Sequence, residues 1–192
     1  MLALAEIFYS VQGEGMWTGT PAVFVRLAGC NLNCRFCDTD YATKAFASVD
    51  AVVARVRELS GACPMVVLTG GEPFAQSESS ALITALRADG RRVHVESNGS
   101  IAVAIADDVW LTVSPKERLT EAMALRANEV KLIVDGRVPD EWYAAFEGHA
   151  VPTFLQPEGN KPANVALAIA AAQARPERFR LGLQAHKFIG IR

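Results

Sequence analysis

Short apolar runs of strand length recur along the whole chain, and they constrain the fold more than any other feature of the sequence. The runs are rich in β-branched residues and mostly lack polar alternation, which is typical of strands covered on both faces. They occupy residues 22–29, 65–69, 92–97, 109–113, 129–134, 151–156 and 179–184. Segments with a helical pattern lie between several of them, at residues 48–59, 77–90, 139–148 and 162–176. Alternation of strands with helices predicts βαβ units and a mainly parallel sheet.

The helical segments carry recognisable end signals. Ser48 suits the N-cap position, Asp50 would lie in the first turn of that helix, and Gly90 suits the position just after a helix. Prolines stand at or near the starts of the last two segments, and Pro176 would end the last one. These signals support the element boundaries predicted from periodicity.

Length selects among parallel α/β architectures. A complete eight-fold barrel typically needs about 250 residues, whereas this chain has 192. We therefore predict an α/β fold, an incomplete TIM-like barrel of about six parallel strands with helices outside, formed by residues 1–192 as one domain. A flat doubly wound sheet is the alternative. In both architectures ligands bind at the carboxyl ends of the strands.

Composition excludes some classes of function. Apolar residues make up 51% of the chain and charged residues 21%, and the formal net charge is −2, which argues against a broad nucleic-acid-binding surface. No apolar stretch approaches the length of a membrane span, and Glu6 comes too early for a signal peptide. We expect a cytoplasmic protein.

Three of the four cysteines fall within eight positions, as Cys30, Cys34 and Cys37 in a C-x3-C-x2-C pattern directly after the first predicted strand. Clustered cysteines in a reducing compartment are typically metal ligands or redox groups. Three thiolates of one loop can hold three irons of a cubane iron–sulfur cluster and leave the fourth iron open, which is the favoured interpretation. Cys63 stands alone before a strand and is interpreted as a small buried hydrophobe.

Two other interpretations of the cysteine pattern remain open at this point. A zinc site could take a fourth ligand from His94, His149 or His186. A ferredoxin-like electron carrier would normally supply a fourth cysteine nearby, and the isolated Cys63 is a poor candidate for that role.

The spacing of these cysteines after the first strand of an α/β partial barrel resembles the radical S-adenosylmethionine superfamily. The resemblance implies a 4Fe-4S cluster on the three cysteines, whose open iron binds the methionine part of S-adenosylmethionine. It also implies roles for loops at later strand ends. Phe36 would pack near the adenine, Gly71 and Glu72 of TGGEP would receive the methionyl ammonium, and Lys116 would pair with the carboxylate. Other cofactor contacts would come from Ser114, Pro115, Gln156, Pro157, Glu158 and Gly159, with Glu96 or Asn98 on the ribose.

Flanking segments narrow the resemblance to one family. EIFYSVQGEG (6–15), CRFCDTDY (34–41) and LQAHKFIGIR (183–192) are similar to the 7-carboxy-7-deazaguanine synthase family, and the similarity extends over essentially the whole chain. The resemblance implies conversion of 6-carboxytetrahydropterin to 7-carboxy-7-deazaguanine with loss of ammonia, in queuosine biosynthesis, with S-adenosylmethionine regenerated. It further implies Mg²⁺ bound by the hydroxyl of Thr39 and the substrate carboxylate, with Asp38 holding a water; hard oxygen ligands suit this ion.

The residues expected at the substrate offer complementary polar groups. Gln12, Gly13 and Glu14 supply amide, backbone and carboxylate partners for a flat pterin. Arg26 would be costly to bury unpaired within its apolar strand, and either a fork onto the substrate carboxylate or an internal pair with a glutamate would satisfy it. The remaining residues implied by the resemblance are Val11, Thr69, His186 and the carboxylate of Arg192, although a bulky cation is an unusual last residue.

Two rival functions stay open from the sequence. A glycyl-radical-enzyme activase shares the cysteine spacing, but would not need QGEG or the His-Lys segment near the carboxyl end. A non-catalytic iron–sulfur or zinc binding module would leave TGGEP and SPK at successive strand ends without a purpose. The resemblance implies a homodimer and a flavodoxin- or ferredoxin-type electron donor as partners.

Overall fold

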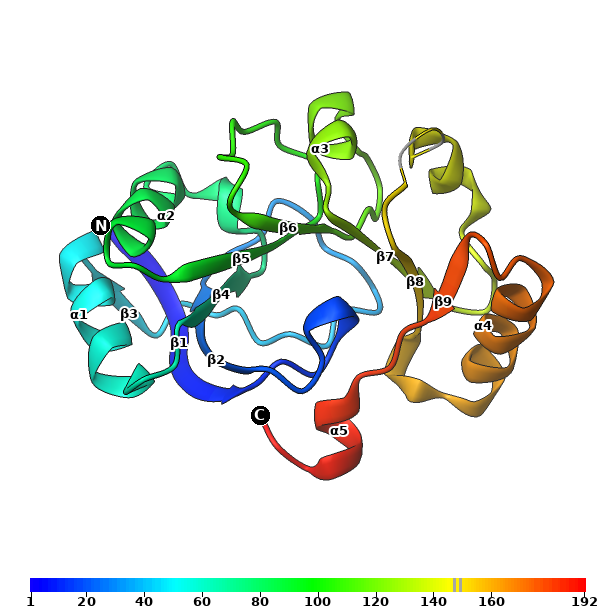
Figure 1. Cartoon of the computed structure of the whole chain (residues 1–192), viewed down its shortest axis with the longest axis horizontal. Helices are drawn as coiled ribbons and strands as arrows, with labels where there is room; N and C mark the ends of the chain where they lie inside the picture. The colour runs from blue at the N-terminus through cyan, green and yellow to red at the C-terminus, as the bar shows by residue number, and fades with distance from the viewer. Residues whose placement is uncertain (147, 149) are drawn as a thin grey trace.

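A single nine-stranded sheet organises the chain, in the strand order β3-β1-β2-β4-β5-β6-β7-β8-β9. The computed structural model describes residues 1–146, 148 and 150–192. The parallel part consists of β2 (Pro21–Leu27), β4 (Met65–Gly70), β5 (Arg92–Ser97), β6 (Trp110–Val113), β7 (Glu129–Val134), β8 (Thr153–Pro157) and β9 (Phe179–Leu181). This confirms the predicted α/β architecture, since the sheet curves into an open partial barrel (Figure 1).

Two strands extend the sheet beyond its parallel part. β1 (Leu2–Val11) pairs antiparallel with β2 and on its other side with the short β3 (Ala45–Ala47). The sequence interpretation did not include either strand. The register of β1 against β2 places Glu6 beside Arg26 and Phe8 beside Phe24, so β1 contributes side chains to the same end of the sheet as β2.

Helices cover the outer face of the sheet. Figure 1 shows α1 (Val49–Ser60), α2 (Ser79–Ala88), α3 (Glu121–Arg126) and α4 (Pro162–Ala174) around the arc of strands. The predicted caps are confirmed: the Ser48 hydroxyl accepts a hydrogen bond from the Ala51 amide at 3.2 Å, and Gly90 follows α2 with a φ of 75°. The helix predicted at 139–148 is instead the 3₁₀ segment η3 (Asp140–Phe146), and Glu147 lies outside the described residues.

Burial explains why the parallel strands read as unbroken apolar runs. Leu68, Val95, Leu111 and Leu132 are completely buried and belong to one apolar cluster between the sheet and the helices. At about 25 cal/mol per Å² of buried apolar surface, such a cluster is the main stabilising contribution to the fold. It also fixes the strand ends, where the loops project.

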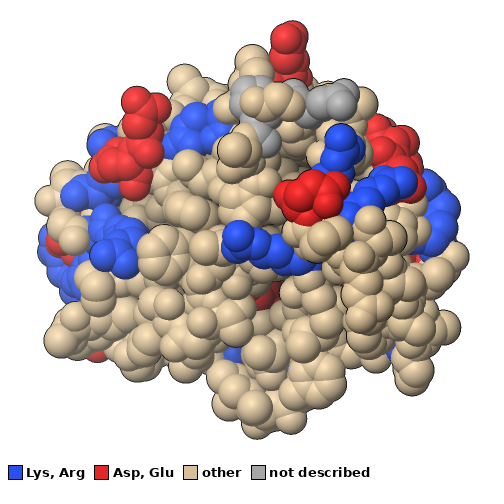
Figure 2. Space-filling view, turned by 45° about the vertical axis from the view of Figure 1, so that its right-hand side comes forward, with Lys and Arg blue, Asp and Glu red and all other residues tan. Residues whose placement is uncertain are grey.

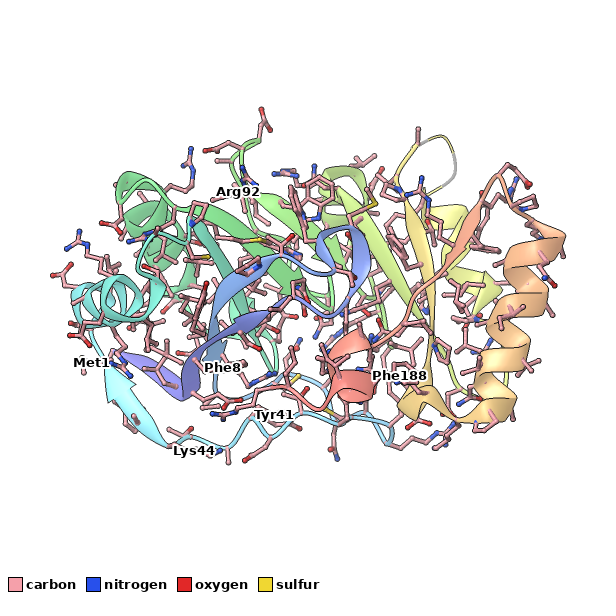
Figure 3. All side chains as sticks on the ribbon, turned by 60° about the horizontal axis from the view of Figure 1, so that its bottom comes forward. Met1, Phe8, Tyr41, Lys44, Arg92 and Phe188 are labelled. Atoms are coloured by element: carbon pink, nitrogen blue, oxygen red, sulfur yellow. The ribbon has the colours of Figure 1, made fainter. Side chains whose placement is uncertain are left out.

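The open side of the barrel is crossed by the carboxyl-terminal segment. The short helix α5 (Ala185–Ile189) lies there, and the chain then runs back toward β1 (Figure 1). Figure 3 shows this last segment passing between β1, where Phe8 is labelled, and the loop that carries Tyr41. On the face shown in Figure 2, charged side chains of both signs lie mostly over the upper half, with Lys and Arg gathered toward the left, and the lower half is largely uncharged. None of the helices in the described part of the chain combines the length and apolar character required to cross a membrane.

Candidate active site

A cavity of about 390 Å³ opens at the carboxyl ends of the parallel strands. It collects residues that are far apart in the sequence, from β1 to the segment after α5. Nearly all residues predicted from the sequence line it: Val11, Gln12, Gly13, Glu14, Arg26, Cys30, Cys34, Phe36, Cys37, Thr39, Thr69, Gly71, Ser114, Lys116, Gln156, Pro157, Glu158, Gly159, His186 and Arg192. Glu72 and Pro115 are the predicted residues that do not.

The cysteines lie on a loop that starts where β2 ends. Gly29 begins the loop with a φ of 77°, which favours glycine, and its amide donates to the Tyr41 carbonyl at 2.9 Å. The loop therefore closes on itself at its base. Within it, the thiols of Cys30 and Cys34 are half-buried, and this burial raises the pKa of both.

These thiols fit a metal cluster better than a single metal ion. Thiols with a raised pKa become ligands only when positive charge lies among them, as iron would supply. Nowhere in residues 1–146, 148 and 150–192 do three His, Cys, Asp or Glu side chains converge closely enough to hold one ion. The three thiols nevertheless line one cavity, as expected if each binds a different iron of a metal cluster.

Of the three histidines considered for zinc, only His94 and His186 lie within the described residues. The ring of His94 is buried inside the sheet, where its Nε2 lies 2.8 Å from the Thr112 hydroxyl, so it cannot reach the cysteine loop. His186 lies on α5 against Gly13, where a Cβ would be 2.2 Å from its Nδ1. His149 lies outside the described residues.

The TGGEP turn packs against the cysteine loop through its backbone. The Glu72 amide donates to the Gly29 carbonyl at 3.1 Å. The Glu72 carboxylate points away from the cavity and is completely buried, accepting from the Phe74 amide at 3.1 Å, the Ser97 hydroxyl at 2.9 Å and the Asn98 amide at 2.7 Å. Its side chain therefore joins the loops after β4 and β5, and only the backbone of this turn is left to face a cofactor.

Lys116 brings a cation close to the cysteine loop. Its ammonium donates to the Ser114 carbonyl at 3.0 Å and to the Ser114 hydroxyl, and it lies 6.0 Å from the centre of the Phe36 ring. Burial lowers the pKa of Lys116 to about 8. A carboxylate bound at this position would offset the cost of burying the ammonium.

The carboxyl end of β8 presents an unsatisfied polar atom to the cavity. The Oε1 atom of Gln156 is buried and has no hydrogen-bond partner among the described residues, although buried polar atoms are normally paired. Gly159 follows with a φ of 60°, which favours glycine. This side of the cavity therefore suits a ligand that carries a hydrogen-bond donor.

On the adjacent strand β7, Lys131 is the centre of a polar cluster that also lines the cavity. The Lys131 ammonium contacts Glu14 and lies 3.7 Å from Glu96. Glu14 also accepts from Gln184 at 2.9 Å, and Glu96 accepts from Gln12 at 3.0 Å. The structure thus groups Glu96 with the residues expected at the substrate and separates it from Asn98, which bonds to Asn31 at 3.0 Å. Sequence reasoning missed Lys131 and Gln184.

Arg26 makes the internal pair expected for it and keeps nitrogens available toward the cavity. Its Nε donates to Glu6 at 2.9 Å, which is the internal pair. Its two terminal nitrogens have no partner in the described part of the chain, and the residue lines the cavity. Arg192 contacts the other oxygen of Glu6, lies 4.9 Å from the centre of the Phe8 ring, and accepts a hydrogen bond from Ser10 on its backbone oxygen.

The residues expected at magnesium lie on the cysteine loop where it meets α5. Thr39 lines the cavity, and Asp38 beside it pairs with Lys187 and accepts from Gln184 at 3.3 Å. Burial opposes ionisation of Asp38, but the contact with Lys187 prevails and lowers its pKa. Hydroxyl and carboxylate oxygens are the ligand types that Mg²⁺ prefers.

Comparison with known proteins agrees with this geometry. A model of the Radical SAM superfamily matches residues 24–151. The chain is 39% identical over 192 residues to a 7-carboxy-7-deazaguanine synthase from Bacteroides thetaiotaomicron, covering 100% of both chains, and 37% identical over 212 residues to one from Burkholderia multivorans, covering 98% of both. A crystal structure of QueE from Escherichia coli superposes with a TM-score of 0.82 at 28% identity, covering 96% of this chain and 94% of that chain.

Proposed function

The chain belongs to the Radical SAM superfamily and, within it, to the 7-carboxy-7-deazaguanine synthase family, and we propose that the cavity at the carboxyl ends of the strands is its active site. The enzyme converts 6-carboxytetrahydropterin into 7-carboxy-7-deazaguanine and ammonia in queuosine biosynthesis. One observation carries the site assignment: the three clustered cysteines, Lys116 and the Lys131 cluster all line one cavity.

Cys30, Cys34 and Cys37 would hold the 4Fe-4S cluster. When bound, the cluster and S-adenosylmethionine supply one-electron chemistry that removes a hydrogen atom from the substrate. The protein's part is to place these groups and to exclude water. The short loop closed by Gly29 and Tyr41 fixes the three thiols relative to the strand ends.

The cofactor-binding residues would lie on the loops nearest the cysteines. Lys116, held by Ser114, would pair with the methionyl carboxylate, and the backbone at Gly71 would approach the methionyl ammonium. The unpaired Oε1 of Gln156 would accept from an amino group of the adenosine. Phe36, Pro115, Pro157, Glu158 and Gly159 would complete the contacts, while the Glu72 side chain supports the turn from behind.

The substrate would lie between the cofactor and the loop after β1. The free nitrogens of Arg26 would receive the pterin carboxylate in a fork. Gln12, Thr69 and His186 would contact the ring, with Val11, Gly13, Glu14 and Arg192 around them. Thr39 would bind Mg²⁺ together with the substrate carboxylate, and Asp38 would orient a bound water.

Anaerobic reconstitution with iron and sulfide tests this function. The protein is offered 6-carboxytetrahydropterin, S-adenosylmethionine, Mg²⁺ and dithionite, and the product is identified by mass. We expect 7-carboxy-7-deazaguanine with S-adenosylmethionine recovered. Formation of deoxyadenosine without the deazaguanine would overturn the substrate assignment but keep the radical chemistry. A single zinc ion without sulfide would overturn both the substrate assignment and the radical chemistry.

The reaction needs a reductant and acts on a small molecule. We further propose a flavodoxin- or ferredoxin-type electron donor, a homodimeric assembly and a cytoplasmic location, which rest on family resemblance. Reduction of the reconstituted cluster by each purified donor, and sedimentation equilibrium of the enzyme, test the first two. A monomer across the micromolar range would contradict the dimer.

A further inference from the structure

Lys131 is a buried cation that no motif of the sequence singled out. It lies within β7, is only 8% exposed, and lines the cavity. Its neighbours Val130 and Leu132 are fully buried in the apolar core on the other face of the sheet, because side chains alternate along a strand. The alternation therefore directs the Lys131 side chain inward, to the interior of the barrel.

Two carboxylates hold the Lys131 ammonium. It contacts the Oε2 atom of Glu14 and lies 3.7 Å from the Oε2 atom of Glu96. Burial alone would lower the pKa of a lysine, but these two charges prevail and raise the pKa of Lys131 above its ordinary value. Burial alone would raise the pKa of Glu96, but the charge of Lys131 outweighs it, and the pKa of Glu96 falls to about 2. Both carboxylates thus act as acceptors beside a donor.

Hydrogen bonds hold both carboxylates, but Glu96 accepts fewer close hydrogen bonds than Glu14. Both oxygens of Glu14 are engaged, by Gln184 at 2.9 Å and by Lys131. In Glu96, Oε1 accepts from Gln12 at 3.0 Å, but Oε2 accepts only a long bond of 3.4 Å from Thr69 and is not in direct contact with Lys131. Glu96 is therefore the carboxylate with accepting capacity to spare.

A purely structural role explains this arrangement poorly. Taking an ammonium and two carboxylates out of water costs several kcal/mol per ion, and apolar replacements of such groups are often equally stable or more stable. The cluster also faces a cavity rather than filling the core. An ammonium has three N–H donors; the hydrogen bond to Glu14 uses one of them, while Glu96 at 3.7 Å is beyond hydrogen-bond distance.

We propose that Lys131 determines substrate specificity. Together with Glu96 it would bind the amino-lactam edge of the pterin ring, while Glu14 holds the Lys131 ammonium in place. This edge carries an exocyclic amine and a ring N–H, which are donors, next to a carbonyl, which is an acceptor. The Glu96 carboxylate matches the donors, and an N–H of Lys131 that is not bonded to Glu14 matches the carbonyl. The inference rests on the proposed function and adds Lys131 as a residue that recognises the pterin ring.

Substrate affinity of Lys131 variants tests the inference. We expect Lys131→Met to raise the Kd for 6-carboxytetrahydropterin roughly 10- to 100-fold, as for a lost hydrogen bond to a charged group. The Kd is measured by equilibrium dialysis on reconstituted enzyme without reductant, so that no turnover occurs. KM should rise in parallel while kcat changes less than about threefold, because the interaction is uniform binding. Lys131→Arg should recover most of the affinity.

A matched control and a folding check accompany these variants. Arg55→Met removes a cation paired with Glu58 at 2.9 Å on the outer helix α1, and it should leave the Kd unchanged. The Kd for S-adenosylmethionine reports whether each variant is folded. Should Lys131→Met fail to fold, Lys131→Gln, which keeps a donor without the charge, takes its place and is expected to bind about tenfold more weakly.

A substrate analogue tests the chemistry of the edge. Replacing the exocyclic amine by a carbonyl, as in a lumazine, places an acceptor against the Glu96 carboxylate, and wild-type enzyme should reject it by about 100-fold or more. Glu96→Gln can turn its amide donor toward that carbonyl and should lose most of this discrimination. If wild-type enzyme converts 6-carboxytetrahydropterin but the Lys131 variants bind it within twofold of wild type, this inference is overturned alone. If wild-type enzyme neither binds nor converts that substrate, the proposed function fails first.

Discussion

Gly71 lies directly against Cys30: a Cβ atom added to Gly71 would be 2.6 Å from the Cβ of Cys30 and 2.1 Å from the Gly29 carbonyl oxygen. Both distances are far shorter than any normal contact. The two loops that would hold the cluster and the cofactor can approach this closely only if residue 71 has no side chain.

Gly71→Ala should therefore separate the two loops. We expect a loss of stability of about 1–3 kcal/mol, as for other overpacked sites, and a fall in turnover of roughly 100-fold from misplacement of the reacting groups. Urea unfolding and steady-state turnover measure the two effects, and the Kd for S-adenosylmethionine shows whether cofactor binding is also weakened. Gly90→Ala is the control, because open space surrounds that glycine. Alanine in this left-handed backbone conformation should cost about 1–2 kcal/mol of stability without weakening cofactor binding.

The four cysteines provide an internal comparison. Alanine at Cys30, Cys34 or Cys37 should reduce iron and sulfide content and abolish cleavage of S-adenosylmethionine, since each thiol would hold one iron. Cys63 is buried at the other end of the sheet, where its thiol donates to the Pro21 carbonyl at 3.0 Å. Cys63→Ala should cost about 1 kcal/mol of stability and keep full cluster content. Cluster loss in that variant, or a full cluster in any of the other three, would contradict the assignment.

The fold was largely predictable because burial on both faces makes parallel strands unbroken apolar runs. Residues 92–97 and 129–134 were predicted with the bounds that β5 and β7 have in the structure. β1 escaped prediction because it lies near the edge of the sheet, with polar and half-exposed side chains such as Glu6 and Tyr9. Its partner β3 has only three residues, too few for a periodic signal.

The candidate site residues that lie on loops could be predicted from the sequence. Those within strands could not, because the sequence does not show which face of the sheet a strand side chain points to. Cysteines, adjacent glycines and the SPK turn stand out because they follow apolar runs. Lys131 lies inside such a run, and the sequence does not say whether its side chain points to the helices or to the barrel interior. The contacts of Glu72 and Glu96 were similarly hidden, because their partners lie far away in the sequence, at the ends of other strands.

Arg26 should be more important for substrate binding than Arg192, although both contact the carboxylate of Glu6. Arg26→Lys keeps the charge but loses the planar fork, so we expect KM to rise about 10- to 100-fold. The Arg192 side chain is 70% exposed, and Arg192→Ala should change KM less than about threefold. Steady-state kinetics of both variants decide, and an equal increase in KM would mean that Arg192 shares the substrate carboxylate.

Glu129 should make the stability of the protein depend on pH. Its side chain is 2% exposed and accepts from the Met16 amide at 3.0 Å, and burial raises the pKa of Glu129 from 4.5 to about 7. Between these pH values the folded state keeps a proton that the unfolded state has lost. The free energy of unfolding therefore decreases as pH rises from about 4.5 to about 7, by roughly 3 kcal/mol at 1.36 kcal/mol per pH unit.

Glu129→Gln isolates this contribution from that of His94, which acts in the opposite direction. Burial lowers the pKa of His94 to about 4, so its share of the stability is lost as pH falls below about 6.5. Both proteins contain His94, and the difference between their unfolding free energies cancels it. We expect the variant to match wild type near pH 4.5 and to exceed it by up to about 3 kcal/mol above pH 7. Urea unfolding across this range, with the exposed Glu58→Gln as control, checks the result; a difference that stays constant with pH would show that Glu129 has the same pKa in the folded and unfolded states.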